Sequence, residues 1–247
     1  VLLCSSAGLA VDPAGRDVLD ILQSINATSA NSLSGLRLTT GPNNSTPALL
    51  LEASNRHIAV PRALTQRALR LLQDHSDITF LCSVRQELGV TGTILAISSE
   101  SSRFLEIESD RRDEIRFHYT HNGQTIVETF PYRLADGRWH QLAVSLNADQ
   151  VSVFVDCNRI YQRTILSPDR TPSSTAGPLS LYVGQRNGQH ALFRGALQDV
   201  KIVTQAHGYL LQCPQQDTEC PTCVKFHDLE QRVQEMSTMY KELTLKV

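Results

Sequence analysis

The stretch that determines the fold is residues 137–157, which read GRWHQLAVSLNADQVSVFVDC. Apolar residues occupy every second position from Leu142 to Leu146 and again from Val151 to Val155. Two such period-two runs, rich in β-branched residues and separated by NADQ at 147–150, predict an antiparallel hairpin. A hairpin with so apolar a face needs other strands to cover it. The stretch therefore predicts the centre of a β-sandwich.

Further short strands are expected on both sides of this hairpin. They are residues 78–84, 93–98, 104–109, 115–120, 125–130, 179–184 and 191–204. Asn122-Gly123 is a strong signal for a two-residue hairpin turn between two of them. A chain of 247 residues with 41% hydrophobic content can bury one full core. Many short strands at regular spacing predict an all-β antiparallel sandwich rather than an α/β fold.

Two helices are expected before these strands. Residues 16–25 carry an apolar stripe at helical spacing, and Pro61 suits the first turn of a helix that runs to Leu72. Residues 26–47 form a polar stretch between the two helices, rich in Ser, Thr, Asn and Gly.

The polar stretch contains three glycosylation triplets of the N-x-S/T form. They begin at Asn26, Asn43 and Asn44. Because the last two overlap, crowding should allow only one of Asn43 and Asn44 to carry a glycan.

The two ends of the chain differ in composition from the sandwich. Residues 1–10, VLLCSSAGLA, have the apolar run and final small residues of a signal peptide cleaved before Val11, the alternative being a frayed first strand. No run of 18 or more apolar residues is present, so no membrane span is expected. After Cys213 the composition changes to charged residues, Gln and Met.

The last part of the chain has an unbroken heptad pattern, with apolar residues spaced alternately by three and four positions. The predicted core positions are Phe226, Leu229, Val233, Met236, Tyr240, Leu243 and Val247. This spacing predicts a coiled coil that is cut short where the chain stops, the alternative being an amphipathic helix docked on the domain. Valine and leucine at the core positions favour two strands, whereas Phe226 and Tyr240 need a wider core.

Several strings along the chain carry a family resemblance. DGRWHQLAVS at 136–145 resembles the central strand of laminin-G-like and thrombospondin N-terminal domains, and GQRN at 184–187 and FRGALQDVKI at 193–202 resemble its closing strands. A closer resemblance is to the amino-terminal region of the NEL-like (neural EGF-like) secreted glycoproteins. It rests on RDEIRFHY at 112–119, VDCNRIY at 155–161, QCP at 212–214 and CPTC at 220–223.

The resemblance implies an extracellular adhesion or signalling module. It implies a laminin-G-like (concanavalin-like) sandwich that binds heparin or heparan sulfate, cell-surface receptors as partners, and assembly into a homotrimer. The expected organisation is a signal-peptide remnant at 1–10, the globular domain at 11–213, a cysteine-rich linker at 214–223 and a coiled-coil helix at 224–247. A structural spacer without glycosaminoglycan binding is the alternative function.

Five of the six cysteines have predicted roles in the mature chain, because Cys4 lies in the expected signal-peptide remnant. Cys157 ends a core strand and Cys213 follows the last one, so a disulfide between them would tie the carboxyl end to the sandwich, and the family's matching cysteines imply the same pair. Cys82 lies at a core position of its strand and is expected to be a buried hydrophobe, with a disulfide partner as the alternative. Cys220 and Cys223 have redox or zinc-site spacing, but before a coiled coil they favour interchain disulfides.

The charges are nearly balanced, but arginine dominates the basic residues. The formal net charge of −2 excludes a histone-like or polybasic chain, so no nucleic-acid partner is predicted. Of the 23 basic residues 19 are arginine, which suits bidentate recognition of sulfate or carboxylate. The candidate heparin contacts, chosen as clustered arginines near strand ends, are Arg111, Arg112, Arg116, Arg159, Arg163 and Arg186. The alternative is that scattered arginines only solubilise the surface.

No catalytic motif is present, and no enzyme activity, cofactor or metal site is predicted. The sequence lacks H-E-x-x-H and G-x-S-x-G strings. Acids such as Asp110 and Glu114 alternate with arginines, which predicts a solvated face. Some laminin-G-like domains bind Ca²⁺ through loop carboxylates, for which Asp156 and Asp199 are the candidates, but the thrombospondin-type branch generally lacks that site.

Overall fold

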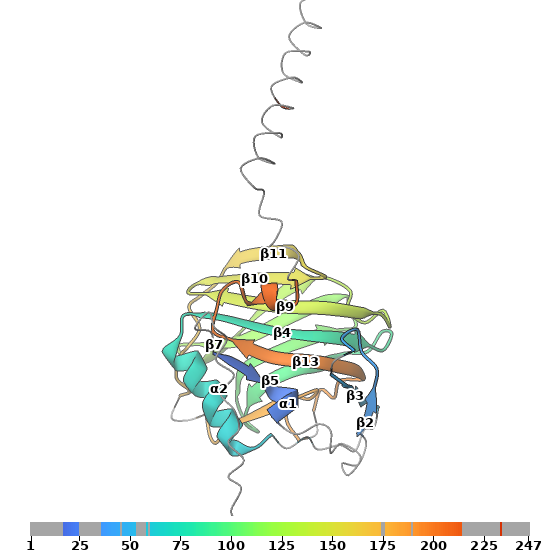
Figure 1. The fold of residues 1–247 in the computed structure, drawn as a ribbon. Helices are drawn as coiled ribbons and strands as arrows, with labels where there is room; N and C mark the ends of the chain where they lie inside the picture. The colour runs from blue at the N-terminus through green and yellow to red at the C-terminus, as the bar shows by residue number, and fades with distance from the viewer. Residues whose placement is uncertain are drawn as a thin grey trace, which may run out of the picture. The chain divides into compact units, whose positions relative to one another are not determined.

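The fold is described from a computed structural model of the chain. The structure describes residues 17–24, 36–44, 46–52, 58, 60–173, 176–188, 190–213 and 233. The chain forms two compact units, residues 1–209 and 210–247. The first is a sandwich of two antiparallel β-sheets, which confirms the predicted fold class (Figure 1).

The larger sheet has eight strands in the order β11-β10-β9-β4-β13-β3-β2, and β1 also pairs with β13. Its strands are β1 (Val18–Asp20), β2 (Leu36–Thr39), β3 (Ala48–Leu51), β4 (Asp77–Gln86), β9 (Trp139–Asn147), β10 (Gln150–Val155), β11 (Asn158–Thr164) and β13 (Gly195–Val203). The smaller sheet has the order β12-β5-β6-β7-β8. Its strands are β5 (Gly92–Ser98), β6 (Arg103–Asp110), β7 (Glu114–His121), β8 (Gln124–Pro131) and β12 (Ser180–Val183).

The hairpin predicted at residues 137–157 is present as β9 and β10. Its register pairs Leu146 with Val151 and Leu142 with Val155, and the turn residue Ala148 has a φ of 51°. β9 also pairs with β4 on its other side, so the hairpin lies within the larger sheet. One face of this hairpin is buried in the core, as expected for a face covered by a second sheet, and Ala143 and Phe154 on its other face are buried as well.

The hydrophobic core lies between the two sheets. Phe80 and Val144 of the larger sheet belong to the same buried cluster as Leu105 and Phe117 of the smaller sheet. Cys82 lies in this cluster as a free thiol, and burial raises its pKa to about 12. The prediction of a buried, unpaired Cys82 is therefore confirmed. Cys157 and Cys213 are each disulfide-bonded, and their pairing with one another stays a prediction.

Short helices flank the sheets. α2 (Arg62–Asp74) begins directly after Pro61, as predicted, and buries Thr65, Ala68, Leu71 and Leu72. The helix expected at 16–25 is wrong in its first part, because Val18–Asp20 is strand β1 and only Ile21–Ser24 forms the short helix α1. Backbone pairing with Lys201–Val203 of β13 holds β1 extended. A 3₁₀ turn, η2, spans Gly208–Leu211.

The second unit is described at two places only, Leu210–Cys213 and Val233. Val233 is helical and its side chain is 57% exposed. The other predicted coiled-coil positions, together with Cys220, Cys223 and the expected signal-peptide remnant, lie outside the described residues. Within the described part of the chain, no helix is long and apolar enough to cross a membrane.

Candidate functional site

A group of exposed arginines lies where the end strands of the two sheets meet. β8 ends the smaller sheet and β11 ends the larger one. The Tyr161 hydroxyl on β11 donates to the carbonyl of Pro131 on β8 at 2.9 Å. Arg163 on β11 also contacts Glu128 on β8 at 2.8 Å, and its guanidinium lies 5.1 Å from the centre of the Phe130 ring. The two strands therefore lie side by side.

The turn between β6 and β7 carries two further exposed arginines to the end of β8. Arg111 and Arg112 lie in this turn, which continues to Asp113. The backbone N–H of Tyr132, just after β8, donates to the carbonyl of Asp113 at 2.8 Å. The turn is thereby held next to the β8 end of the sandwich.

We call this surface the arginine edge. Its members are Arg111, Arg112, Arg133, Arg159 and Arg163, all of which are exposed. Sequence analysis missed Arg133, which follows β8 and contacts Asp113 at 3.5 Å. The signal for Arg133 was weak, because it has no basic neighbour in the sequence. It joins the other arginines only because the β6–β7 turn is hydrogen-bonded to the residue that follows β8.

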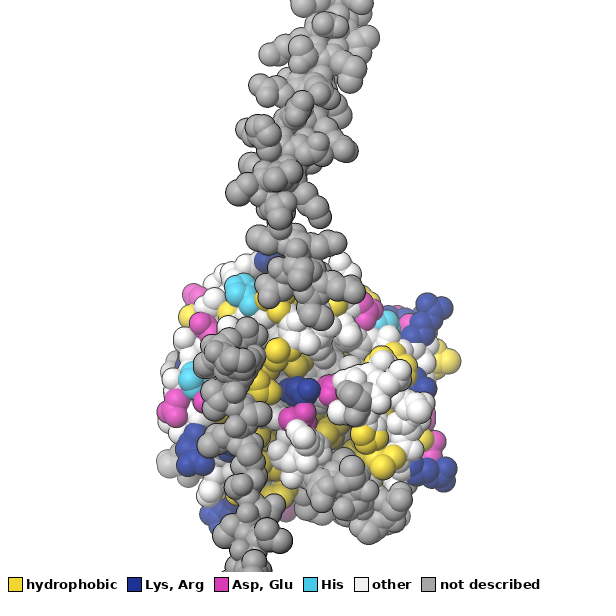
Figure 2. All heavy atoms as spheres, in the orientation of Figure 1, with side chains coloured by type: hydrophobic (Ala, Val, Ile, Leu, Met, Phe, Trp, Pro, Cys, Tyr) yellow, Lys and Arg dark blue, Asp and Glu magenta, His cyan; other side chains and the backbone are white. Residues whose placement is uncertain are grey.

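The arginine edge has more positive than negative charge. Arg133 and Arg163 are paired with Asp113 and Glu128. Among the described residues, Arg111, Arg112 and Arg159 make no ion pair with a carboxylate. On the visible face of the larger sheet, by contrast, Lys and Arg side chains are scattered, mostly around its rim (Figure 2).

The other two candidate arginines, Arg116 and Arg186, are bound to carboxylates within the domain. They belong to a group that we call the carboxylate cluster, made of Glu106, Glu108, Arg116, His118 and Arg186. Its members on β6 and β7 alternate with core residues such as Leu105 and Phe117, so they lie on the face of the smaller sheet opposite to the core. The two glutamates and His118 are nevertheless buried, with Glu106 fully buried and His118 only 4% exposed, and Arg116 is partly buried.

Arg186 is the central cation of this cluster. It follows β12 and reaches past β5 to β6, where its Nε lies 2.9 Å from both carboxylate oxygens of Glu106. Its Nη2 lies 3.6 Å from Glu108, and Glu108 also contacts Nε2 of His118 at 3.0 Å. Burial opposes the charged form of Glu108, but the hydrogen bond from His118 and the charges of His118 and Arg186 outweigh it and lower its pKa.

Arg116 is held by the acids around it. It contacts Asp110 closely and Glu114 at 2.8 Å. Burial opposes its charge, yet the Glu114 hydrogen bond and the charge of Asp110 raise the pKa of Arg116. Asp110 is itself only 7% exposed, so the predicted solvated face is wrong at this residue. Because Arg116 and Arg186 are each paired with carboxylates of the domain, an external sulfate would have to compete with those partners.

The geometry also bears on metal binding. Glu106, Glu108 and His118 offer three ligand atoms within 4.8 Å of one another. Arg186 already occupies both oxygens of Glu106 and lies against Glu108, so two carboxylates face a guanidinium in the place a cation would take. We therefore describe the group as an ion-pair cluster.

The two calcium candidates lie far apart. Asp156 follows β10 and Asp199 lies on β13, with β9 and β4 between these strands. Three strand spacings separate them by at least about 14 Å. Asp156 contacts Nδ1 of His140 at 2.8 Å, and Asp199 contacts Nζ of Lys201 at 3.2 Å. They therefore cannot share one cation.

The structure distinguishes the two overlapping glycosylation triplets. Nδ2 of Asn43 donates to Asp199 at 3.1 Å, and the Asn43 backbone N–H donates to Gln198 at 3.0 Å. Asn44 is exposed in the adjoining turn. A glycan on Asn44 leaves the contacts of Asn43 with β13 intact. The Asn26 triplet lies outside the described residues and stays a prediction.

We expect Asn44→Gln to remove one N-glycan from mammalian-expressed protein, because both asparagines are exposed but the side-chain amide of Asn43 is already bonded to Asp199. The substitution leaves the triplet that begins at Asn43 intact. Ser45→Ala is the matched control, since it destroys only the Asn43 triplet and should leave the mass of the glycosylated protein unchanged. Intact mass with and without glycosidase measures both variants. Glycan loss in Ser45→Ala alone would assign the glycan to Asn43.

Comparisons with known proteins agree with this architecture. Residues 53–207 match a laminin G model of the concanavalin A-like lectin/glucanases superfamily. The human "Protein kinase C-binding protein NELL1" is 36% identical over 242 residues, covering 97% of this chain and 29% of the relative. The Xenopus laevis "Protein kinase C-binding protein NELL2" is 34% identical over 254 residues, covering 100% of this chain and 30% of the relative.

The chain thus spans less than a third of the length of these relatives. Among solved structures, a leech intramolecular trans-sialidase is similar with a TM-score of 0.51 at 10% identity, covering 64% of this chain and 25% of that one. This similarity supports the sandwich fold alone.

Proposed function

The chain belongs to the concanavalin A-like lectin/glucanases superfamily and is a homologue of the NEL-like proteins, and on that premise we propose that it is an extracellular adhesion or signalling module that binds heparin or heparan sulfate. The observation that carries the proposal is the arginine edge. Two pieces of chain distant in sequence, the β6–β7 turn and β11, there present exposed arginines beside one another.

The chemistry of guanidinium groups supports this ligand. Arginine forms paired hydrogen bonds with sulfate or carboxylate oxygens, and the planar donors of an exposed arginine suit a ligand that lies on the surface. The net charge of −2 means that attraction of a polyanion must come from a local concentration of cations. Arg111, Arg112 and Arg159 supply such cations, because no carboxylate among the described residues pairs with them.

Assembly would strengthen binding at this surface. The heptad pattern at 226–247 supports a parallel coiled coil, and the family resemblance implies three chains. Each chain would add one arginine edge, and linked copies bind a repeating polysaccharide with higher overall affinity than one copy. Receptors on the cell surface and a secreted location are part of the same proposal.

Replacing Arg111 and Arg112 together by alanine should lower the salt concentration at which the intact oligomer elutes from immobilised heparin. The reason is that exposed charges act over a screening distance of about 8 Å at physiological salt, so each lost cation weakens a salt-sensitive contact. The two side chains are exposed and the domain should stay folded, which thermal unfolding checks.

The matched control is Arg62→Ala with Arg70→Ala. It removes the same charge from exposed positions of α2, which contacts β12 at the opposite end of the smaller sheet from β8. An equal shift in both double variants would show that only net charge matters. If the unmodified oligomer passed through the heparin column at low salt without binding, only the alternative function as a structural spacer would remain.

A further inference from the structure

The chain between β11 and β12 forms a long loop that is rich in serine, threonine and proline. These three residue types make up eight of the twelve residues at 167–178. Among the described residues of the loop, 165–173 and 176–179, none lies in a helix or a strand. Loops of this length without secondary structure are uncommon in compact domains and are often functional. The composition is typical of segments that carry O-linked glycans.

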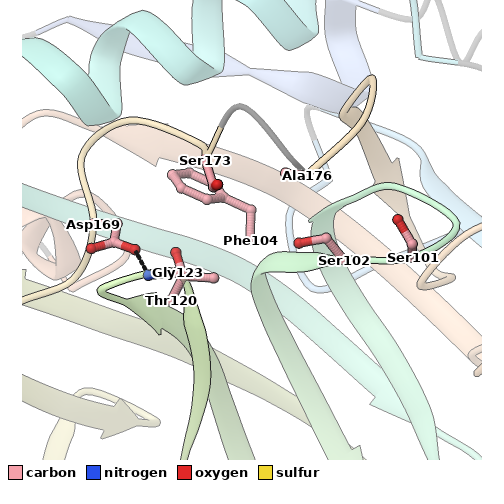
Figure 3. A pocket seen from close by; sticks show the side chains of 8 residues that line it. All are labelled: Ser101, Ser102, Phe104, Thr120, Gly123, Asp169, Ser173 and Ala176. Carbon is pink, nitrogen blue, oxygen red and sulfur yellow. Dashed lines mark hydrogen bonds between the residues drawn. The ribbon is translucent and has the colours of Figure 1, made fainter.

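The first part of this loop is held against the β7–β8 hairpin. The carboxylate of Asp169 accepts the backbone N–H of Gly123 at 2.8 Å (Figure 3) and that of Asn122 at 2.9 Å. Both turn residues have a positive φ, 52° for Asn122 and 74° for Gly123, which is the turn predicted from the Asn-Gly pair. The backbone N–H of Asp169 also donates to the carbonyl of Thr120 at 2.7 Å. Asp169 is therefore fixed by both its side chain and its backbone.

The loop is fixed a second time at Ala176. The hydroxyl of Ser99, in the turn between β5 and β6, donates to the carbonyl of Ala176 at 2.6 Å. The backbone N–H of Ala176 donates to the carbonyl of Ser173 at 3.0 Å. Figure 3 shows the chain from Asp169 to Ser173 as an arch. The arch is thus held at both of its ends.

Thr171 lies within the arch and has no bonding partner in the described part of the chain. It is exposed, and neither its hydroxyl nor its backbone groups make a hydrogen bond to a described residue. Threonine hydroxyls often bond to nearby backbone groups, which would hide them from an enzyme. Pro172 also restricts Thr171 to an extended backbone. An enzyme that binds its acceptor as an extended segment can therefore reach this hydroxyl without breaking a contact of the folded domain.

The two described serines of the loop are bound more firmly than Thr171. The carbonyl of Ser167 contacts Nδ1 of His121 at 2.8 Å. The carbonyl of Ser173 accepts the N–H of Ala176. An enzyme that drew either serine into an extended segment would have to break these contacts. The structure therefore favours Thr171 as the acceptor.

We propose that Thr171 is an O-glycosylation site that accepts N-acetylgalactosamine, the first sugar of a mucin-type glycan. The donor is the sugar linked to uridine diphosphate. The bond between the threonine Oγ1 and the anomeric carbon forms as the bond between that carbon and the diphosphate breaks, and the hydroxyl proton leaves with the diphosphate. The proposal rests on the secreted location that is part of the proposed function.

The site lies away from the β6–β7 turn of the arginine edge. Arg111 and Arg112 lie in the turn before β7, whereas Asp169 is bonded to the turn after β7. The eight residues of β7 separate the two turns by about 25 Å. A glycan on Thr171 therefore leaves Arg111 and Arg112 open to a polyanion.

The test expresses the full chain behind an added secretory leader in mammalian cells, so the chain enters the secretory pathway whatever its natural location. After enzymatic removal of N-glycans, intact mass should show at least one remaining N-acetylhexosamine, and peptide fragmentation should place it on Thr171. Thr171→Val should lose this glycan. The matched control is Thr164→Val, which changes an exposed threonine paired within β11 and should keep the glycan.

The sugar is identified in cells that form uridine diphosphate N-acetylgalactosamine only when N-acetylgalactosamine is supplied. The glycan on Thr171 should appear only with the supplement. An unmodified Thr171 in the secreted protein, or a modification of it that forms without the supplement, would overturn the proposal. Because the peptide mapping uses the unmodified chain, it stands even if Thr171→Val does not fold. Heparin elution of the same samples tests the proposed function separately, since a chain without the O-glycan can still bind heparin.

Discussion

Replacing Arg186 with alanine is expected to lower the melting temperature of the domain by about 6–12 °C, corresponding to about 3 kcal/mol of unfolding free energy. The side chain of Glu106 is fully buried, and Arg186 contacts both of its oxygens. Without Arg186, the buried Glu106 carboxylate keeps the Thr93 hydroxyl and the more distant Arg103, whose Nε lies 3.8 Å away, but loses its closest cation. Glu108 loses a nearby cation at the same time. Thermal unfolding followed by circular dichroism measures the shift.

The control is Arg163→Ala, which breaks an ion pair on the arginine edge. Arg163 is 45% exposed and contacts Glu128, so its loss should cost less than about 1 kcal/mol. A double variant, Arg186→Ala with Glu106→Gln, should recover part of the lost stability because it removes a buried carboxylate that has lost its closest cation. Equal shifts for Arg186→Ala and Arg163→Ala would show that the cluster contributes no more than a surface pair.

The same comparison assigns the two arginines to different roles. Folded Arg186→Ala protein, measured well below its melting temperature, should elute from heparin as the unmodified protein does. Arg186 was a reasonable candidate from the sequence, because it lies in a polar string after a strand. The sequence does not show that its side chain turns toward β6, a strand about 80 residues earlier in the chain.

The central strands were predictable because apolar side chains recur at every second position on the face that meets the other sheet. β4, β9 and β10 each show a period of two, and the Asn122-Gly123 pair identified the β7–β8 turn. β1 was predicted as a helix because its apolar residues continue into α1 at helical spacing. β2, β3 and β11 were not predicted, since they are short or polar and depend on pairing with neighbours in the sheet.

The carboxylate cluster did leave a signal that sequence analysis did not use. On β6, Glu106 and Glu108 alternate with Leu105 and Ile107. The three-residue turn after Asp110 places Glu108 opposite Arg116 and Glu106 opposite His118. This register predicts ion pairs across the two strands. The burial of these pairs could not be predicted, because it depends on segments that pack over the sheet from other parts of the chain.

The arginine edge depends even more on distant contacts. The edge exists because β8 and β11, which end different sheets, lie next to one another through Tyr161 and Arg163. Neither contact repeats along the chain with a period that could reveal it, so sequence reasoning could propose arginines as a residue type but not their grouping.

The unmodified protein is expected to be a disulfide-linked trimer, and combining Cys220→Ser, Cys223→Ser and Val233→Asp should reduce its mass in solution threefold. Val233 is helical and 57% exposed, so an apolar side chain on the heptad seam is available to another helix. Aspartate there would bring one carboxylate from each chain into an apolar seam without a partner.

The two elements of this assembly depend on one another. Three heptads form a marginal coiled coil, and disulfides at its start raise the effective concentration of the helices. The cysteine substitutions alone should therefore make the mass depend on protein concentration, which light scattering under controlled redox conditions measures.

Gln234→Asp adds the same charge one position outside the seam and should leave the trimer intact. A monomeric unmodified protein, or a trimer that tolerates Val233→Asp without disulfides, would place the interface elsewhere, because a seam built on Val233 cannot bury three unpaired carboxylates and still associate.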